Sequence, residues 1–183
     1  MKALLTSAGF ENYKISKVFL NQINKDPKDI KVVFIPTAAD SADSIVMLPK
    51  CMNDLLNIGI SKENVYVYDL HYKMKFSILS NYDAVYVCGG NTNYLIQRIN
   101  KSGFRKELIK YITNNGVYVG VSAGSCIMAN NVEKSLGLIN KTINVHCDNG
   151  ETPGPLNKDM KTISLTNKQA ILLSNKNDGS VIE

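Results

Sequence analysis

Residues 120–124 read Gly-Val-Ser-Ala-Gly and directly follow the apolar run 117–119. A serine at the centre of Gly-x-Ser-x-Gly, between a strand and a helix, is typical of a nucleophile elbow, in which a sharp turn lifts the Oγ atom clear of the sheet. Glycines on either side let the backbone bend tightly. Residues 125–129 can continue as a buried helix. The pattern predicts a nucleophile at Ser122, although a glycine-rich turn that only closes a strand fits the same letters.

A serine hydroxyl needs a neighbouring imidazole to take its proton before it attacks. The chain has two histidines, His71 and His146. His146 ends a short alternating stretch, residues 142–145, and precedes a polar loop, so we predict that it is the general base. A lone histidine at a strand end is often structural, and this interpretation stays open. His71 lies in a polar stretch, where we expect a surface or hinge role.

A second strand-like run, residues 85–88, ends in Gly89, Gly90 and Asn91 and is followed by a helix-like segment. Backbone N–H groups near a helix N-terminus stabilise the negative charge of a tetrahedral intermediate, and glycine permits close approach. The loop therefore predicts an oxyanion and substrate-binding site. A phosphate-binding loop, as in a flavodoxin-like nucleotide binder, is the competing interpretation.

Taken in order, these motifs resemble the dipeptidase E (alpha-aspartyl dipeptidase) and cyanophycinase family of serine peptidases. The resemblance covers most of the chain and rests on residues 3–9, 32–38, 89–92, 122–125 and 145–148. It implies a class I glutamine-amidotransferase-like fold, with Ser122 as nucleophile and His146 as base. It also implies backbone oxyanion donors at Gly90 and Ala123, a small peptide as substrate, and catalysis without a cofactor or a metal.

The chain departs from this family where it is shorter, between Ser122 and His146 and again after His146. Related enzymes carry in the first of these segments an acidic residue that orients the histidine. Residues 123–145 hold one carboxylate, Glu133, and the pair 130–131 is Asn-Asn where relatives can carry an aspartate. Glu133 is therefore the expected third member of a triad, with a backbone carbonyl or Asp148 as the alternatives.

The aspartyl dipeptidases are also expected to carry an arginine after the histidine, to bind an acidic substrate. The only arginines here are Arg98 and Arg105, which both precede His146. Lys158 or Lys161 could substitute, but a lysine lacks the planar fork that grips a carboxylate. The sequence therefore does not predict aspartyl specificity.

The rest of the chain predicts the scaffold that positions these residues. Strand-like runs fall at 3–8, 31–37, 64–69, 83–88 and 116–121, and helix-like segments at 11–24, 43–58, 91–100 and 103–114. This alternation predicts a doubly wound α/β fold, with a mostly parallel sheet and helices on both faces. Ligands collect at the carboxyl ends of such strands, where Gly89, Gly90, Ser122 and His146 fall. The runs 162–166 and 169–173, joined by Asn167-Lys168, predict a small C-terminal hairpin.

Composition limits the function classes. With 183 residues, of which 44% are apolar, the chain can bury one core, so we expect a single domain over residues 1–183. The net charge of +5 comes from scattered lysines, which argues against nucleic-acid binding. No apolar run approaches the roughly 20 residues of a membrane span, so we expect a cytoplasmic protein that does not bind membranes. The four cysteines lack CxxC spacing and predict reduced thiols. A homodimer is one of the states that the sequence leaves open.

Two other functions remain to be weighed. An α/β-hydrolase shares the elbow but places an acid and then a histidine well downstream, whereas His146 follows Ser122 by 24 residues. A catalytically silent relative that binds a small molecule or peptide in the retained cleft is the second alternative, and the shortened segments motivate it.

Overall fold

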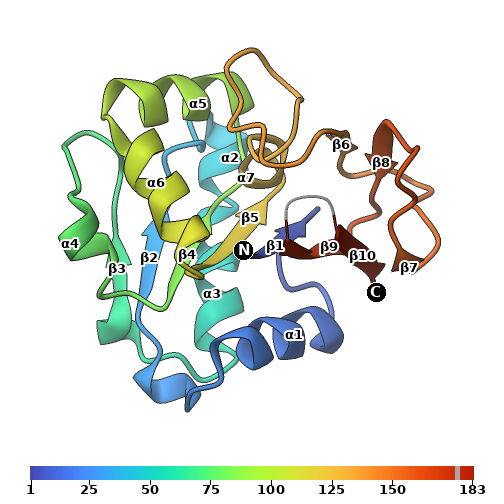
Figure 1. Ribbon diagram of the computed structural model, residues 1–183. Coiled ribbons are helices and arrows are strands. Elements are labelled where there is room, and N and C mark those ends of the chain that lie inside the picture. Colours follow the sequence, from blue (N-terminus) through green and yellow to red (C-terminus); the bar gives the residue numbers. More distant parts are fainter. Residues whose placement is uncertain (176–177) are drawn as a thin grey trace.

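The computed structural model describes residues 1–175 and 178–183 and contains two β-sheets (Figure 1). Its strands are β1 (Lys2–Thr6), β2 (Val32–Ile35), β3 (Val65–Val67), β4 (Ala84–Val87), β5 (Val117–Val121), β6 (Thr142–Asn144), β7 (Gly154–Pro155), β8 (Thr162–Ser164), β9 (Ala170–Asn175) and β10 (Asp178–Ile182). Among the described residues, eight strands form one sheet in the order β3-β2-β4-β5-β1-β9-β10-β7. The first five of these strands are parallel to one another, which confirms the mostly parallel sheet.

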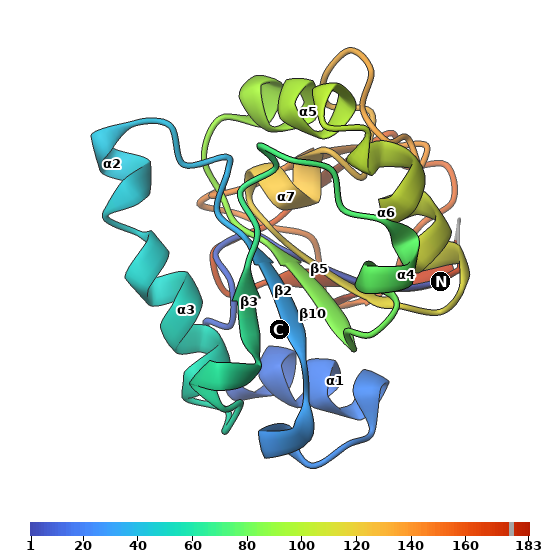
Figure 2. The ribbon, with the colours of Figure 1, turned by 90° about the vertical axis from the view of Figure 1, so that its left-hand side faces the viewer.

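Helices cover both faces of this sheet. The α-helices are α1 (Tyr13–Ile23), α2 (Ala42–Ile45), α3 (Leu48–Leu56), α4 (Phe76–Leu79), α5 (Thr92–Lys101), α6 (Phe104–Thr113) and α7 (Ala123–Cys126), with short 3-10 turns at Pro27–Asp29 and Lys62–Asn64. Figure 2 shows α1 and α3 on one side of the sheet and α5, α6 and α7 on the other. The expected doubly wound α/β fold is confirmed.

The two apolar layers follow from the alternation of side chains along the buried strands. In β4, Val85 and Val87 belong to the cluster under α5 and α6, whereas Ala84 and Tyr86 belong to the cluster under α1 and α3. Both sets of side chains are fully buried, which explains why the run is continuously apolar.

One predicted helix is divided. The expected segment 43–58 forms α2 and α3, and the chain restarts its helix at Leu48. Pro49 lies in the first turn of α3 and has no N–H to donate to the preceding turn, so a continuous helix would lose a hydrogen bond there. Asn12 caps α1 by accepting a hydrogen bond from the Ile15 N–H, which places its start two residues after the predicted one.

The predicted pairing at the C-terminus is wrong. Residues 162–166 do not form a hairpin with 169–173, because β8 pairs with β6 in a separate parallel sheet. Instead β9 runs antiparallel to both β1 and β10. The C-terminal antiparallel pair is thus β9 with β10. Docking against β1 buries Ile171 and Leu173, which a solvent-facing hairpin would leave exposed.

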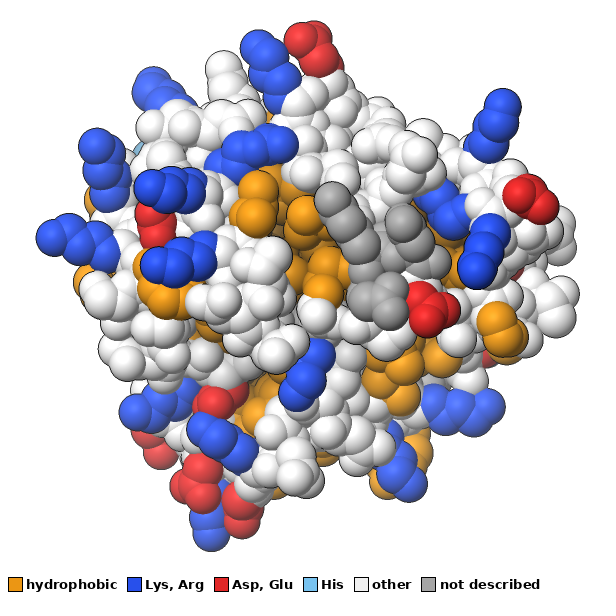
Figure 3. Space-filling view, viewed as in Figure 1, with side chains coloured by type: hydrophobic (Ala, Val, Ile, Leu, Met, Phe, Trp, Pro, Cys, Tyr) orange, Lys and Arg blue, Asp and Glu red, His pale blue; other side chains and the backbone are white. Residues whose placement is uncertain are grey.

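The surface agrees with the scattered charge of the sequence. On the face shown in Figure 3, lysine and arginine side chains are spread around the molecule and are not gathered in one stripe. Among the described residues, no helix combines the length and the apolar character that crossing a membrane requires.

Candidate active site

Ser122 stands on the sharp turn between β5 and α7. Its backbone has φ 47° and ψ −104°, a strained conformation for a residue with a side chain. The turn is held by the end of β1, because the Thr6 carbonyl accepts hydrogen bonds from the Ser122 N–H at 3.0 Å and from the Ser125 Oγ at 2.7 Å. Ser125 is fully buried, so this second serine supports the elbow and does not face substrate.

The two glycines of the pentapeptide allow α7 to pack directly on the sheet. A Cβ atom at Gly120 would lie 2.6 Å from the carbonyl of Gly124, closer than side chains approach backbone. A Cβ atom at Gly124 would collide with the carbonyl of Val87 on the adjacent strand. The spacing Gly-x-Ser-x-Gly therefore reflects backbone contact on both sides of Ser122.

His146 and Ser122 lie within hydrogen-bond distance. The imidazole Nε2 is 3.0 Å from the Ser122 Oγ, across 24 residues of sequence. The backbone of His146 has φ 58°, and its N–H donates to the Ser7 Oγ at 2.7 Å, just after the end of β1. The adjacent Cys147 N–H donates to the Leu165 carbonyl at 3.0 Å. These contacts aim the ring at the elbow.

The other imidazole nitrogen contacts Asn167, a residue that the sequence did not single out for the site. The Asn167 Oδ1 is 2.7 Å from His146 Nδ1. The expectation for Glu133 is therefore corrected, because an amide oxygen occupies the position that its carboxylate was to fill. Asp148 does not take this position either, and neither does a backbone carbonyl.

Glu133 is held away from the histidine by the path of the chain after α7. The Arg105 guanidinium donates to the carbonyls of Lys134 at 2.6 Å and Ser135 at 2.8 Å, which ties this loop to α6. Asn131 exchanges hydrogen bonds with the backbone of Ile143 in β6, so the position where relatives can carry an aspartate is structural here. Glu133 is exposed and lines a separate shallow hollow beside α5.

A tight turn before β9 positions Asn167. The Gln169 N–H donates to the Thr166 carbonyl at 3.1 Å, and the buried Gln169 side chain accepts from the Thr166 N–H. The Asn12 Nδ2 donates to the Lys168 carbonyl at 2.7 Å. Because β9 is antiparallel to β1, it begins where β1 ends, beside the elbow. Only the position of β9 in the sheet reveals the role of this turn, which explains why the sequence pattern missed it.

The glycine loop borders the nucleophile. A Cβ atom at Gly89 would lie 3.7 Å from the Ser122 Oγ, and Gly89 and Gly90 line the same cavity as that oxygen. The backbone N–H groups of Gly90 and Ala123 have no hydrogen-bond acceptor among the described residues. Asn91 differs from the expectation, because its side chain caps α5 through the Tyr94 N–H and donates to Asp40. It lines the hollow of Glu133 and not the cavity at Ser122.

The cavity at Ser122 has a volume of about 290 Å³. Its lining combines Ser122, His146 and Asn167 with residues of α3 and with two charged side chains, Glu11 and Lys50. The Lys50 ammonium is 2.7 Å from Glu11 and 3.7 Å from Asp54. Burial opposes the charge, but these carboxylates outweigh it and raise the pKa of Lys50. Burial also raises the pKa of Asp54.

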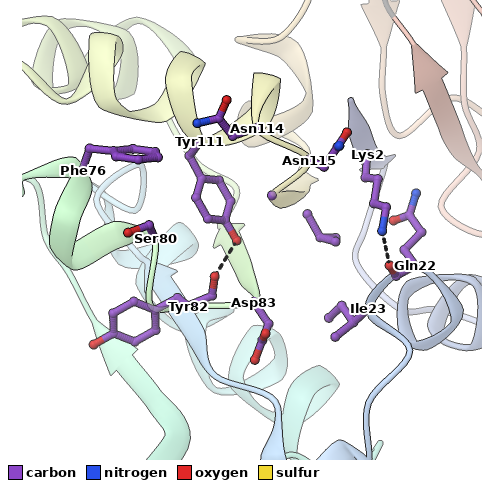
Figure 4. A pocket seen from close by; sticks show the side chains of 12 residues that line it. Lys2, Gln22, Ile23, Phe76, Ser80, Tyr82, Asp83, Tyr111, Asn114 and Asn115 are labelled. Carbon is purple, nitrogen blue, oxygen red and sulfur yellow. Dashed lines mark hydrogen bonds between the residues drawn. The ribbon is translucent and has the colours of Figure 1, made fainter.

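A second cavity, of about 240 Å³, lies at the opposite end of the sheet (Figure 4). Its lining includes Lys2 and Val117, where β1 and β5 begin, whereas Ser122 follows the end of β5. In it the Tyr111 hydroxyl donates to the Tyr82 carbonyl and the Lys2 ammonium to the Gln22 carbonyl. It therefore contributes no residue to the serine and histidine pair.

The remaining expectations concern His71 and metal binding. His71 is exposed and its Nδ1 is 3.1 Å from Asp69, so it lies on the surface, as expected, and outside the cavity lining. Hydrogen bonding by the His71 N–H lowers the pKa of Asp69. Within residues 1–175 and 178–183, no three His, Cys, Asp or Glu side chains are grouped so as to hold a metal ion.

A model of one known protein family matches nearly the whole chain. The model of Peptidase family S51 matches residues 3–178. Among curated proteins, an uncharacterized peptidase from Listeria monocytogenes is 29% identical over 101 residues, which cover 55% of this chain and 49% of that protein. One from Pasteurella multocida is 26% identical over 102 residues, covering 56% and 49%. The chain spans about half the length of the curated relatives it matches.

Solved structures show the same fold. A Listeria monocytogenes protein, named as a candidate peptidase E, aligns with TM-score 0.73 at 22% identity and covers 99% of this chain and 96% of its own. A peptidase from an acI-B1 actinobacterium aligns with TM-score 0.65 at 15% identity, covering 99% and 86%.

Proposed function

The chain belongs to peptidase family S51, and we propose that it is a serine-type peptidase that cleaves small peptides. The observation that carries this proposal is the 3.0 Å contact between the Ser122 Oγ and the His146 Nε2 on a strained elbow. Nucleophile and base at this distance are the minimum arrangement for acyl transfer through a serine.

The proposed reaction begins with proton transfer from the Ser122 Oγ to the His146 Nε2 while the oxygen attacks the peptide carbonyl. For this the Nε2 must be unprotonated, so the ring proton must sit on Nδ1. The Asn167 Oδ1, at 2.7 Å, accepts a hydrogen bond from the Nδ1–H and thereby holds the required tautomer. His146 then donates its new proton to the leaving amine. Water next attacks the acyl-enzyme, again with His146 as the base, and the acyl group is released from Ser122.

The negative charge of the tetrahedral intermediate requires donors beside Ser122. We assign this role to the N–H groups of Gly90 and Ala123, which lack acceptors among the described residues and flank the nucleophile. Loss of a single donor of this kind typically costs about 10²–10³ in rate. Gly89 contributes space, because a side chain there would press against the Cβ of Ser122 at 3.1 Å.

The size of the cavity supports a small substrate. At about 290 Å³ it lies at the lower end of the range of small-molecule sites, enough for the side chain and backbone of a residue or two. A dipeptide or another short peptide fits this volume.

A fluorophosphonate probe tests the proposal, because it reacts with a serine only when the oxygen is activated. We expect labelling at Ser122, no labelling in Ser122→Ala, and loss of peptide turnover by about 10³-fold or more. His146→Gln should behave in the same way, and His71→Gln is the matched control that keeps labelling. An unlabelled protein that nonetheless binds peptides would identify it as a catalytically silent relative.

A further inference from the structure

Two charged residues that the proposed reaction does not use, Glu11 and Lys50, line the cavity at Ser122, and Asp54 forms an ion pair with Lys50. Glu11 precedes the cap of α1, Lys50 lies on α3, and Asp54 follows Lys50 by one helical turn. The same lining includes five largely apolar residues, Met47, Leu48, Cys51, Cys88 and Val121. A substrate side chain that enters this space therefore meets apolar surface as well as charge.

The charge of Lys50 is compensated by two carboxylates. Its Nζ lies 2.9 Å from the Ala8 carbonyl and 2.7 Å from Glu11 Oε1, both within hydrogen-bond distance. Asp54 Oδ1 lies 3.7 Å away, at ion-pair distance. Its charge is therefore compensated from both sides, and it does not offer the free cation that an acidic substrate requires.

Asp54 is also committed, on the side away from the cavity. Its Oδ2 accepts hydrogen bonds from the Phe10 N–H and the Tyr86 hydroxyl, both at 2.9 Å, and its side chain is only 10% exposed. Because Asp54 faces Lys50 as well, it shares in neutralising the ammonium. The Oε2 atom of Glu11 is therefore available to accept a hydrogen bond from a ligand.

Glu11 is the charged group that the cavity offers to a ligand. Its side chain is 32% exposed, it lines the cavity, and only its Oε1 contacts Lys50. Ser44, another polar lining residue, exchanges hydrogen bonds with the backbone and side chain of Ser41. The cavity thus presents a negatively charged acceptor together with apolar walls.

We propose that Glu11 makes this cavity selective for a substrate side chain with an apolar stem and a cationic end, as in lysine or arginine, on the acyl side of the cleaved bond. The proposal rests on the serine-peptidase function proposed above. Each methylene of the stem that is removed from water favours binding, and the charged end gains a charge-assisted hydrogen bond to Glu11. An acidic side chain would instead meet the Glu11 carboxylate and an already paired lysine.

Lysine and norleucine provide a matched pair of substrates, because they share the stem and differ in the ammonium. With aminocoumarin amides, we expect kcat/KM for lysine to exceed that for norleucine about tenfold, and glutamate to be the poorest of the three. Glu11→Gln should bring the lysine-to-norleucine ratio towards one and should raise the relative rate of glutamate, since Lys50 then loses one of its two carboxylates. Glu133→Gln is the matched control and should retain the ratio of the unaltered protein.

The α-ammonium of the substrate is the other source of positive charge. Each amide is therefore measured with its α-amine free and acetylated. The proposal would be overturned if Glu11→Gln lowered kcat/KM for every amide with a free α-amine, whatever its side chain, and left the acetylated amides unchanged. A preference for glutamate in the unaltered protein would also overturn it.

Binding to Ser122→Ala separates this inference from the catalytic one. Thermal shift is measured with lysinamide and norleucinamide, free and acetylated, at concentrations up to saturation. A larger shift for the lysine compounds that disappears in the Ser122→Ala, Glu11→Gln double variant supports the cationic pocket even if the protein cleaves nothing. Equal shifts for the two side chains, including no shift for either, overturn it. Failure of fluorophosphonate labelling alone would reject only the peptidase function.

Discussion

At the scale of single residues, the site couples a serine and a histidine to an amide where many serine hydrolases have a carboxylate. The Asn167 Oδ1, 2.7 Å from His146 Nδ1, can fix the tautomer of the ring. It adds no negative charge to stabilise the imidazolium that forms during attack. Cysteine peptidases of the papain type use asparagine in this way, so the arrangement is chemically sufficient for orientation. We regard Asn167 as a positioning residue and expect its lack of negative charge to limit the rate.

Asn167→Asp tests this limit. A carboxylate at the same position accepts a hydrogen bond from the Nδ1–H and also stabilises the imidazolium, so we expect a rise in kcat of about tenfold. The same charge keeps the free imidazolium protonated to higher pH. The acid limb of the profile of kcat/KM against pH should therefore move up by about one unit. Stopped assays from pH 5 to pH 9 measure both effects.

A matched control places the same charge elsewhere. Asn93 is exposed in the first turn of α5, outside the lining of the cavity, so Asn93→Asp should leave the pH profile in place. A slower enzyme in Asn167→Asp, or an unshifted acid limb, would contradict the positioning role. Asn167→Ala should lower the rate of fluorophosphonate labelling without changing the free energy of unfolding by more than about 0.5 kcal/mol, because Asn167 is exposed.

How much of the site could be predicted depends on whether each partner lies near its motif. Ser122 stands in a local pattern, and His146 is one of two histidines, so the sequence could propose this pair, whose side chains lie 3.0 Å apart. Asn167 comes close to His146 only because β9 inserts beside β1, and no local signal marks that insertion. Glu133 was chosen by its charge, but the hydrogen bonds of Arg105 to the neighbouring backbone direct its loop towards α6.

At the scale of secondary-structure elements, the elbow works because β5, α7 and β4 are in backbone contact. At Gly120 a Cβ atom would lie 2.6 Å from the carbonyl carbon and oxygen of Gly124. These are backbone atoms, which cannot rotate away as a side chain could. Thr6, at the end of β1, adds a hydrogen bond from its Oγ1 to the Gly120 carbonyl at 2.9 Å. The strain at Ser122 is thus maintained by the packing around it.

Gly120→Ala should therefore affect stability and chemistry together. Forcing α7 away from β5 is expected to cost about 1–3 kcal/mol of unfolding free energy, as overpacking does. It should also slow fluorophosphonate labelling, because the Ser122 Oγ moves relative to His146. Urea unfolding and labelling rates measure the two effects. Gly103→Ala is the comparison, since no atom lies within 4 Å of the added Cβ, although its φ of +75° carries some strain of its own. Normal labelling in Gly120→Ala would show that this backbone contact does not determine the position of the Ser122 Oγ.

The parallel strands and their helices could be predicted because each forms from a local apolar pattern. The buried runs of β2, β4 and β5 are continuous, and a proline, glycine or polar residue follows each within two positions, so their type and order followed from the sequence. The pairing of β8 with β6 and of β9 with β1 could not be predicted. Both are contacts between distant segments, and short strands such as Thr162–Ser164 carry too few residues to specify a partner.

At the scale of the whole molecule, one sheet gathers the site from segments that are far apart in sequence. The carboxyl ends of β4 and β5 supply the glycine loop and the serine. The antiparallel β9 begins at the same edge, because Thr6 pairs with Ala170, and it brings Asn167 with it. We therefore expect that weakening the packing of β9 disturbs the site directly, whereas weakening the core elsewhere lowers stability without disturbing the site.

Ile171→Ala and Phe104→Ala separate these two consequences. Both side chains are fully buried in the same apolar cluster, but Ile171 lies on β9, next to the residue that pairs with Thr6, whereas Phe104 begins α6. Each truncation should cost about 2–5 kcal/mol of unfolding free energy. Labelling of Ser122 is then measured at a temperature where each variant remains folded by circular dichroism. We expect the folded fraction of Phe104→Ala to react at the normal rate, and that of Ile171→Ala to react more slowly because the turn carrying Asn167 loses its anchor. Equal rates would mean that Asn12 and Gln169 hold this turn without the strand, and an equal slowing in both would mean that the elbow depends on the whole core.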